Sequence, residues 1–260
     1  MTLRSGGWSI ELLDCGAIEL PGEALGPEFG EAVMTPVLAT LWRGHGRTVL
    51  VDAGAGPCDV LWPGGAGLPD ALERIGVAPE EITDIVLTHL DFDHAGGVVA
   101  GAWPEPLAPA FPSTPVHVAE FELDWWWTAE QRRLTVGTRI LQALRDAGVL
   151  ETFPDGADVL PGVRARSAPG HCAGHTALEV ADADGVLLYL ADAIHHRAHV
   201  EHPEWDSLYD RKAEVALATR TGLLAEAEER GAVLIASHID SPGRIERRDG
   251  RATWSDIALT

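Results

Sequence analysis

Histidine and aspartate residues gather directly after short apolar segments of this sequence. His89, Asp91, Asp93 and His94 fall within six residues of one another, after the apolar segment 85–87. Imidazole and carboxylate groups are the usual protein ligands of zinc, and also of manganese and iron. The pattern therefore indicates a site for a divalent metal ion.

The same residue types recur after three further segments: His171 and His175, Asp192 and His195, and His238. Taken singly, such a histidine is most often a hydrogen-bonded core residue, and such an aspartate is most often a turn-former. The run from His89 to His94 differs, because four ionisable groups crowded at one strand end are hard to stabilise without a cation. Strand ends that share one edge of a sheet can bring all these side chains together.

Short strands with helices between them must position these residues. The patterns predict strands over 8–15, 33–43, 48–52, 85–87, 116–118, 163–167, 176–181, 186–191 and 233–236, and a final hairpin over 244–254. Helices are predicted over 69–75, from residue 79, over 120–147, and over 211–230 with Gly231 after its end. No linker divides the chain, so we expect a single α/β domain over residues 1–260, built from two sheets.

Composition and charge narrow the class of protein. The chain has 260 residues, 46% hydrophobic and 23% charged, which is ordinary globular composition. A formal charge of −21 repels nucleic acid and anionic membranes, so we expect neither as a partner. There is no long apolar run and no export signal, and three scattered cysteines fit a reducing compartment. We therefore expect a cytoplasmic protein.

Nearly the whole chain resembles the metallo-β-lactamase superfamily. The run from Thr88 to Gly97 is similar to the family signature His-x-His-x-Asp-His. The family's other motifs are matched in order: an early aspartate by Asp52, the third metal motif by His171, the bridging aspartate by Asp192, and the last ligand by His238. The resemblance implies an α/β fold of four layers, an αββα sandwich with the metals at one edge between its sheets.

The resemblance also implies two divalent metal ions per chain, with a hydroxide between them. By position, the first ion takes His89, Asp91 and His171, the second takes Asp93, His94 and His238, and Asp192 bridges them. Asp52 would orient a ligand or its loop.

Asp91 departs from the family pattern, because it stands where the second signature histidine is expected. A carboxylate at this position also resembles the flavodiiron branch, which has glutamate there and uses iron. With Asp91, Asp93, Asp192 and a hydroxide, the charge of two divalent ions is about neutralised, which predicts a weaker Lewis acid. We expect zinc first, with manganese or iron favoured by the extra oxygen ligand. The alternative is that Asp91 ligates weakly or not at all.

The region after Asp192 resembles the branch that contains methyl parathion hydrolase and quorum-quenching lactonases. The resemblance lies in Asp192-Ala193-Ile194-His195, in 202–205, and in 209–220 with Asp210 and Arg220. It implies hydrolysis of a lactone, ester or phosphotriester by the metal-bridged hydroxide. The catalytic candidates are Asp93, which is also a ligand, and His195, which would donate a hydrogen bond to substrate or a proton to the leaving group. Structural support of the site is the alternative for His195.

Two segments are candidate walls for a small-molecule substrate. Trp103 and Trp125-Trp126-Trp127 lie where the family builds a cap, and three adjacent residues cannot all face the core side of a helix. At least one is expected to face an apolar pocket or a homodimer interface. The loop 20–34 is the other candidate wall.

Two other function classes stay open at this point. An iron-dependent oxidoreductase is suggested by the carboxylate variant of the signature, although the chain has no flavodoxin partner domain. A non-catalytic ligand-binding protein is the other alternative, although every metal position holds a competent ligand.

Overall fold

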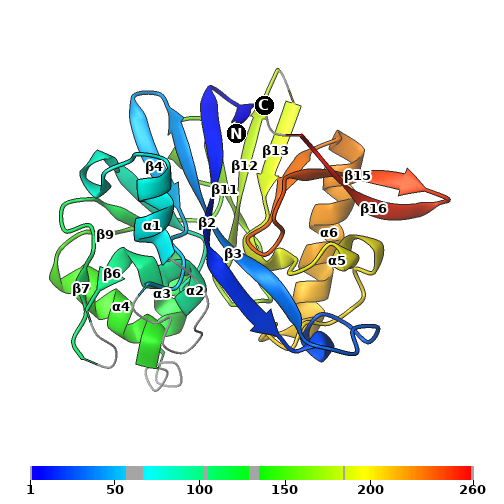
Figure 1. Ribbon diagram of the computed structural model, residues 1–260, viewed down its shortest axis with the longest axis horizontal. Helices are drawn as coiled ribbons and strands as arrows, with labels where there is room; N and C mark the ends of the chain where they lie inside the picture. The colour runs from blue at the N-terminus through cyan, green and yellow to red at the C-terminus, as the bar shows by residue number, and fades with distance from the viewer. Residues whose placement is uncertain (1, 57–66, 102–104, 129–134, 184, 259–260) are drawn as a thin grey trace. The chain divides into compact units, whose positions relative to one another are not determined.

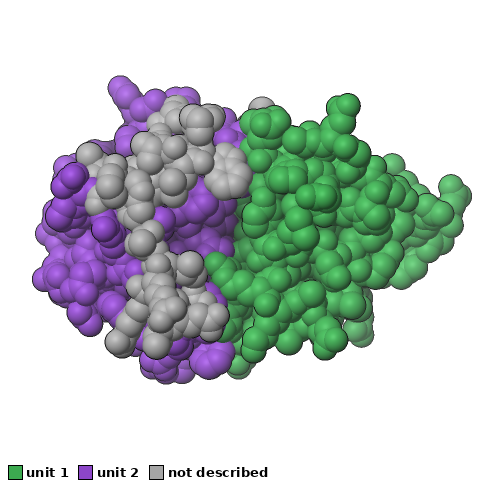
Figure 2. Space-filling model, turned by 90° about the horizontal axis from the view of Figure 1, so that it is seen from below, with its two compact units in different colours: residues 1–6, 19–36, 155–260 green, residues 7–18, 37–154 purple. Residues whose placement is uncertain are grey.

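The computed structural model describes residues 2–56, 67–101, 105–128, 135–183 and 185–258 (Figure 1). The chain divides into two compact units, coloured separately in Figure 2. Unit 1 comprises residues 1–6, 19–36 and 155–260, and unit 2 comprises residues 7–18 and 37–154. The single domain over 1–260 stays a prediction.

The sheet of unit 2 places β2 (Trp8–Leu20), β3 (Val33–Gly44), β4 (Arg47–Val51), β5 (Asp84–Leu87), β8 (Val116–Ala119) and β9 (Leu150–Phe153) side by side in that order. β3 and β4 form an antiparallel hairpin, whereas β4, β5, β8 and β9 run parallel. Residues 49–51 and 85–87 are fully buried, as expected for parallel strands covered on both faces. A small ribbon joins β6 (Val99–Ala100) to β7 (Ala108–Pro109).

Among its described residues, unit 2 contains the helices α1 (Gly67–Arg74), α2 (Phe92–Ala95), α3 (Glu120–Trp126) and α4 (Thr135–Asp146), and single 3-10 turns at Pro79–Glu81 and Gly96–Val98. The prediction of one helix over 120–147 is wrong, because α3 ends at Trp126 and residues 127–128 form a turn. The helix expected from Pro79 is only a 3-10 turn. Trp126 is buried, whereas Trp125 and Trp127 are partly exposed, so the three tryptophans do not all face the core. Trp103 lies outside the described residues.

The sheet of unit 1 orders β10 (Asp158–Leu160), β11 (Val163–Ser167), β12 (Thr176–Asp182), β13 (Gly185–Tyr189), β14 (Val233–Ile235), β15 (Gly243–Arg248) and β16 (Arg251–Asp256). Neighbours are antiparallel except β13 and β14, so this sheet is mixed. β1 (Leu3–Ser5), α5 (Ala198–Glu201), α6 (Ala213–Arg230) and 3-10 turns at Gly22–Ala24 and Ala191–Ala193 complete the unit.

α6 packs on the sheet of unit 1 through Leu223, Leu224 and Ala227, which join one core cluster with Leu188 and Leu234 (Figure 1). The helix ends as expected at Gly231, which takes the left-handed conformation with φ 58°. No helix among the described residues is long and apolar enough to cross a membrane.

Strand direction explains how each unit gathers its chemistry-bearing residues. β11 and β13 are each antiparallel to β12, and β14 is parallel to β13, so their carboxyl ends lie at the same edge of the sheet. The segments that follow them carry His171, Asp192 and His238. In unit 2, the parallel strands β4 and β5 likewise end at one edge, next to Asp52 and His89.

Two glycines let the segment after β4 lie against the segment after α2. Gly97 N–H donates to Gly54 O, and His94 O accepts from Ala53 N–H at 2.7 Å. A Cβ added at Gly97 would lie 1.9 Å from Ala53 O, far inside any real contact. Only glycine therefore allows this backbone-to-backbone approach.

We predict that Gly97→Ala destabilises the protein by about 1–3 kcal/mol, the usual cost of overpacking a buried site. Gly222, in α6, has nothing within 4 Å of an added Cβ. Gly222→Ala is the matched control and should stabilise by up to about 1 kcal/mol, because alanine is the better helix former. Urea denaturation followed by circular dichroism measures both, and a Gly97→Ala variant as stable as the parent would contradict the prediction.

Candidate metal centre

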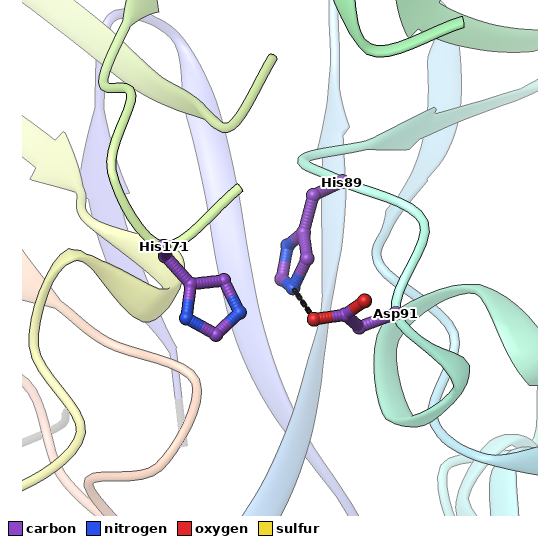
Figure 3. Close-up of side chains that lie close together, drawn as sticks. All are labelled: His89, Asp91 and His171. Atoms are coloured by element: carbon purple, nitrogen blue, oxygen red, sulfur yellow. Dashed lines mark ion pairs between the residues drawn. The ribbon is translucent and has the colours of Figure 1, made fainter. Parts of the chain in front are cut away.

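In unit 2, His89 and Asp91 extend from the end of β5 so that His89 Nε2 lies 3.7 Å from Asp91 Oδ2 (Figure 3). Asp91 occupies the N-cap position of α2, where an aspartate usually accepts a hydrogen bond from the helix. Its carboxylate makes no capping hydrogen bond and instead approaches the imidazole. The carboxylate of Asp91 is thus directed toward His89 rather than toward the start of the helix.

Asp52 supports both histidines of the same motif. Its carboxylate contacts His94 Nδ1 at 3.0 Å and accepts hydrogen bonds from the backbone N–H and hydroxyl of Thr88. Thr88 Oγ1 in turn lies 3.0 Å from His89 Nδ1. Asp52 takes a left-handed backbone conformation, with φ 56°, which aspartate tolerates better than most residues. The expected orienting role of Asp52 is consistent with these contacts.

In unit 1, three imidazoles surround one carboxylate oxygen. Asp192 Oδ2 lies 3.6 Å from His171 Nε2, 3.5 Å from His195 Nε2 and 3.4 Å from His238 Nε2. All four side chains are buried. Asp192 is therefore at the centre of the group, as a bridging ligand would be.

The backbone around Asp192 is strained at Ala191 and is held in place by hydrogen bonds to His175. Ala191, the residue before it, is buried with φ 45°, a conformation that costs a residue with a Cβ on the order of 1 kcal/mol. His175 braces the turn: its Nε2 accepts the Asp192 N–H at 3.0 Å and its Nδ1 donates to Ala168 O. Both ring nitrogens of His175 are thus engaged in holding the backbone around Asp192.

The histidine tautomers fit a metal. His238 Nδ1 must donate to the carbonyl oxygen of Pro36 at 2.8 Å, which leaves the basic lone pair on Nε2. His94 Nδ1 likewise donates to Asp52, and His171 Nδ1 faces Asp210 Oδ1 at 3.6 Å. Histidine ligands characteristically have one ring nitrogen held by an oxygen acceptor while the other binds the metal.

The spacings fit a metal as well. Nitrogen-to-oxygen distances of 3.4–3.8 Å, such as His238 to Asp192 and His94 to Asp93, are too long for hydrogen bonds. Two ligands of one ion, each about 2.0–2.2 Å from it, are separated by about this much at tetrahedral angles. Within unit 1, ligand atoms of His171, Asp192 and His195 lie within 4.8 Å of one another.

A buried carboxylate and arginine lie behind His171. Arg220, which is fully buried, contacts Asp210 Oδ2 at 3.3 Å and donates to the carbonyl oxygens of Pro203 and Trp205. Burial alone would raise the pKa of Asp210, but contact with His171 and the positive charge of Arg220 lower the pKa to about 2. Asp210 therefore stays ionised beside the imidazole and increases its basicity.

His195 is held by its backbone rather than by its ring. Its backbone N–H donates to His199 Nδ1, and His199 Nε2 donates to Leu25 O at 3.0 Å. Among the described residues, neither ring nitrogen of buried His195 has a hydrogen-bond partner. Burial lowers the pKa of His195, so its ring is neutral at pH 7. Such a neutral imidazole can donate an N–H hydrogen bond to a bound small molecule.

The structure thus gathers the predicted residues in two groups. Unit 2 brings together Asp52, His89, Asp91, Asp93 and His94, and unit 1 brings together His171, Asp192, His195 and His238. Sequence reasoning missed the supporting roles of His175 and His199. For His175 a signal existed, because it is the second histidine of the Gly-His-x-x-Gly-His pattern at 170–175. For His199 no local pattern in the sequence indicates its role.

The comparisons with known proteins agree on one family. Residues 33–238 match the family described as Metallo-beta-lactamase superfamily. This range contains every residue of the two groups. The family match therefore covers the same motifs that the sequence analysis singled out.

The curated relatives are distant and longer. "Probable metallo-hydrolase Rv2300c" of Mycobacterium tuberculosis is 29% identical over 219 residues, which cover 74% of this chain and 64% of that protein. An N-acyl homoserine lactonase of Bacillus cereus is 30% identical over 131 residues, covering 50% of this chain and 46% of the lactonase. The chain therefore spans less than two thirds of the length of either relative.

Solved structures show the same fold. The hydrolase AbOPH, of the beta lactamase superfamily, matches with a TM-score of 0.85 at 22% identity, covering 100% of this chain and 97% of AbOPH. AidC, a dizinc quorum-quenching lactonase, matches with a TM-score of 0.85 at 20% identity, covering 100% of this chain and 98% of AidC. The expected α/β fold is confirmed, with two mixed sheets flanked by helices.

We predict that Asp210→Asn weakens metal binding by about 10- to 100-fold, the usual effect of losing a carboxylate that supports a ligating histidine. Asparagine keeps the shape and an oxygen acceptor but removes the charge beside His171. Competition with a chromophoric chelator measures the affinity. Asp206→Asn, at an exposed position four residues earlier, is the control, and equal affinities in the two variants would contradict the prediction.

We also predict that His199 makes stability depend on pH. Burial, followed by repulsion from His195 and Arg220, lowers the pKa of His199 to about 3. The unfolded chain, with a pKa of about 6.5, binds this proton first, so the stabilising contribution is complete above pH 6.5 and is lost as the pH falls toward 3.

His199→Gln removes the imidazole and, with it, this pH-dependent contribution to stability. The difference in unfolding free energy between parent and variant should therefore shrink below pH 6 by up to about 1.4 kcal/mol per pH unit. Urea titrations from pH 8 to pH 4 measure it. The value at pH 8, where both proteins lack this charge, isolates the loss of packing, and a difference that stays constant with pH would contradict the prediction.

Proposed function

The chain belongs to the metallo-beta-lactamase superfamily, and we propose that it is a metal-dependent hydrolase acting on a lactone or ester, with phosphotriesters as a second substrate class. Two divalent ions held by its histidines and aspartates would activate water and polarise the ester oxygen. The observation that supports this most is the tautomer arrangement, in which hydrogen bonds hold Nδ1 of His94 and of His238 on oxygen acceptors while the carboxylate of Asp210 faces Nδ1 of His171.

We assign the metal ligands as the sequence motifs place them: His89, Asp91, Asp93, His94, His171, Asp192 and His238. Family membership supports this assignment, with Asp192 as the proposed bridging ligand. Zinc is the first ion proposed, because AidC is a dizinc enzyme. Asp91 adds an oxygen ligand that favours manganese or iron relative to a histidine at that position.

His195 is the proposed donor to the substrate. It is buried beside Asp192, its pKa is lowered by burial, and its ring nitrogens have no hydrogen-bond partner among the described residues. A neutral imidazole can donate a hydrogen bond to the ester or a proton to the leaving alkoxide. Asp93 would act as a ligand of the metal ion that activates the water.

An aromatic cluster in unit 1 favours a substrate with an apolar part. The ring edge of Phe29 contacts His196 at 4.9 Å and Trp205 at 6.1 Å between centroids, and Trp205 stacks on His202 at 4.2 Å. These rings are partly exposed and join the loop 20–34 to the segment after α5. Such a surface suits an acyl chain or an aryl group.

Lactones are the first substrates to test. The Bacillus relative is an N-acyl homoserine lactonase, and AidC was solved with a product of that reaction. The iron-dependent oxidoreductase stays the second candidate, favoured by the carboxylate that Asp91 adds beside His89. A small-molecule substrate is part of the proposal, while a homodimer and a cytoplasmic location stay predictions.

We predict two metal ions per chain in protein purified without added metal, and lactone or aryl-ester hydrolysis that is lost with chelator and restored by metal. His195→Phe should reduce kcat by about 10²- to 10⁴-fold, the usual contribution of a positioned proton donor, with unchanged metal content. Elemental analysis and steady-state kinetics on a panel of lactones and aryl esters measure both.

His45→Asn, at an exposed turn in unit 2, is the matched control and should retain activity. One ion or none per chain would remove the dinuclear assignment. Two ions without any hydrolysis, accompanied by visible iron absorption and oxygen consumption, would favour the oxidoreductase instead.

A further inference from the structure

A fully buried carboxylate outside the ligand set contacts the peptide between two proposed ligands. Glu122, in the first turn of α3, is 0% exposed. Its Oε1 accepts a hydrogen bond from the backbone N–H of Leu90 at 3.0 Å and from the indole Nε1 of Trp126 at 2.7 Å. Leu90 lies between His89 and Asp91, so Glu122 contacts the metal motif through its backbone.

Burying an ionised carboxylate is costly unless hydrogen bonds compensate, and charge-assisted bonds to N–H groups are the strong kind. Nothing in α3 itself requires this arrangement, because the start of a helix can be capped by a solvent-exposed residue at much lower cost. The carboxylate is therefore best explained by what it holds, which is the turn after β5.

The held peptide determines where Asp91 points. The Leu90 N–H and the His89 C=O belong to one planar peptide group, so fixing one fixes the other. Leu90 is itself fully buried, which restricts the next pair of dihedral angles. Asp91 follows directly, with φ −69° and ψ 150° and a carboxylate aimed at His89 Nε2 instead of the helix.

Trp126 anchors the carboxylate in turn. Its indole is buried at the other end of α3, four residues after Glu122, where helix geometry brings the two side chains onto one face. The same ring packs against Gly137 of α4, where an added Cβ would lie 2.5 Å from Trp126. α3 and α4 thus form a rigid support for the metal motif.

We propose that Glu122 is a positioning residue that fixes the approach of Asp91 to the metal ion shared with His89, and that it thereby sets which metal the site prefers. The inference rests on the proposed role of Asp91 as a ligand. Asp91 supplies the oxygen atom that favours manganese or iron over zinc. Loss of Glu122 would let Asp91 turn away, for example to cap α2, and would leave a site with fewer oxygen ligands.

The test uses the full chain and three variants, with Co²⁺, Zn²⁺ and Mn²⁺ as probes. Glu122→Ala removes the hydrogen bonds to Leu90 and Trp126, and Glu122→Gln keeps an oxygen acceptor of the same shape. Glu120→Ala, at an exposed position in the first turn of the same helix, is the matched control. Absorption of the Co²⁺-loaded protein reports the ligand geometry, and chelator competition gives the ratio of Mn²⁺ to Zn²⁺ affinity.

We expect Glu122→Ala to change the Co²⁺ spectrum and to lower Mn²⁺ affinity about 10- to 100-fold, with a smaller change for Zn²⁺. Glu122→Gln should restore the parent spectrum, and Glu120→Ala should match the parent. Equal losses of Mn²⁺ and Zn²⁺ affinity, or an unchanged spectrum in folded Glu122→Ala, would overturn the proposal. If Glu122→Ala fails to fold, Trp126→Phe replaces it, because it removes one hydrogen bond while keeping most of the ring volume.

Asp91→Asn separates this inference from the function on which it rests. If this variant leaves the affinity ratio and spectrum unchanged, Asp91 is not a ligand and the proposed ligand set fails at that residue. If Asp91→Asn changes both while Glu122→Ala changes neither, only the positioning role of Glu122 is overturned.

Discussion

The centre depends on one constraint, the fixed tautomer of its histidines. An imidazole has two similar nitrogens, and it presents a lone pair in a defined direction only when an acceptor holds the other as N–H. Hydrogen bonds hold two of the rings, through Asp52 for His94 and the carbonyl oxygen of Pro36 for His238, while the carboxylate of Asp210 faces His171 Nδ1 at 3.6 Å. These acceptors come from three distant parts of the sequence, so the fold must form before the ligand set exists.

The fold meets this constraint with parallel strands and a few strained residues. Parallel strands align their carboxyl ends at one edge, which places Asp52 next to Thr88 and aligns the segments after β11, β13 and β14. Asp52 and Ala191 then accept positive φ values, so that the chain turns sharply where a ligand or its support must project. Strain of this kind persists only where surrounding contacts determine the conformation, and His175 and Thr88 provide them.

The sequence was informative where ligands are close together along the chain. The run from His89 to His94 could be recognised because six residues carry four candidate ligands, two histidines and two aspartates, after an apolar strand. The supporting residues were harder to predict, since a buried Glu122 and an exposed Glu120 look alike in the sequence of α3. Glu122 binds Leu90, 32 residues away, and no local pattern encodes such a contact. The break after Trp126 was also missed, because the helical pattern of the sequence continues past the point where α3 ends.

The buried acids also suggest how the centre balances affinity against reactivity. Asp52, Asp210 and Glu122 are ionisable groups that each support a ligand or its backbone without occupying a ligand position. Negative charge near a cation strengthens its binding, but the same charge makes the cation a weaker Lewis acid. Each of these acids is engaged by a donor, which offsets part of its field: Thr88 at Asp52, Arg220 at Asp210 and Trp126 at Glu122. The chain thereby obtains the orienting effect of buried carboxylates with less of their cost to reactivity, which leaves Asp91, the proposed direct ligand, to tune the metal.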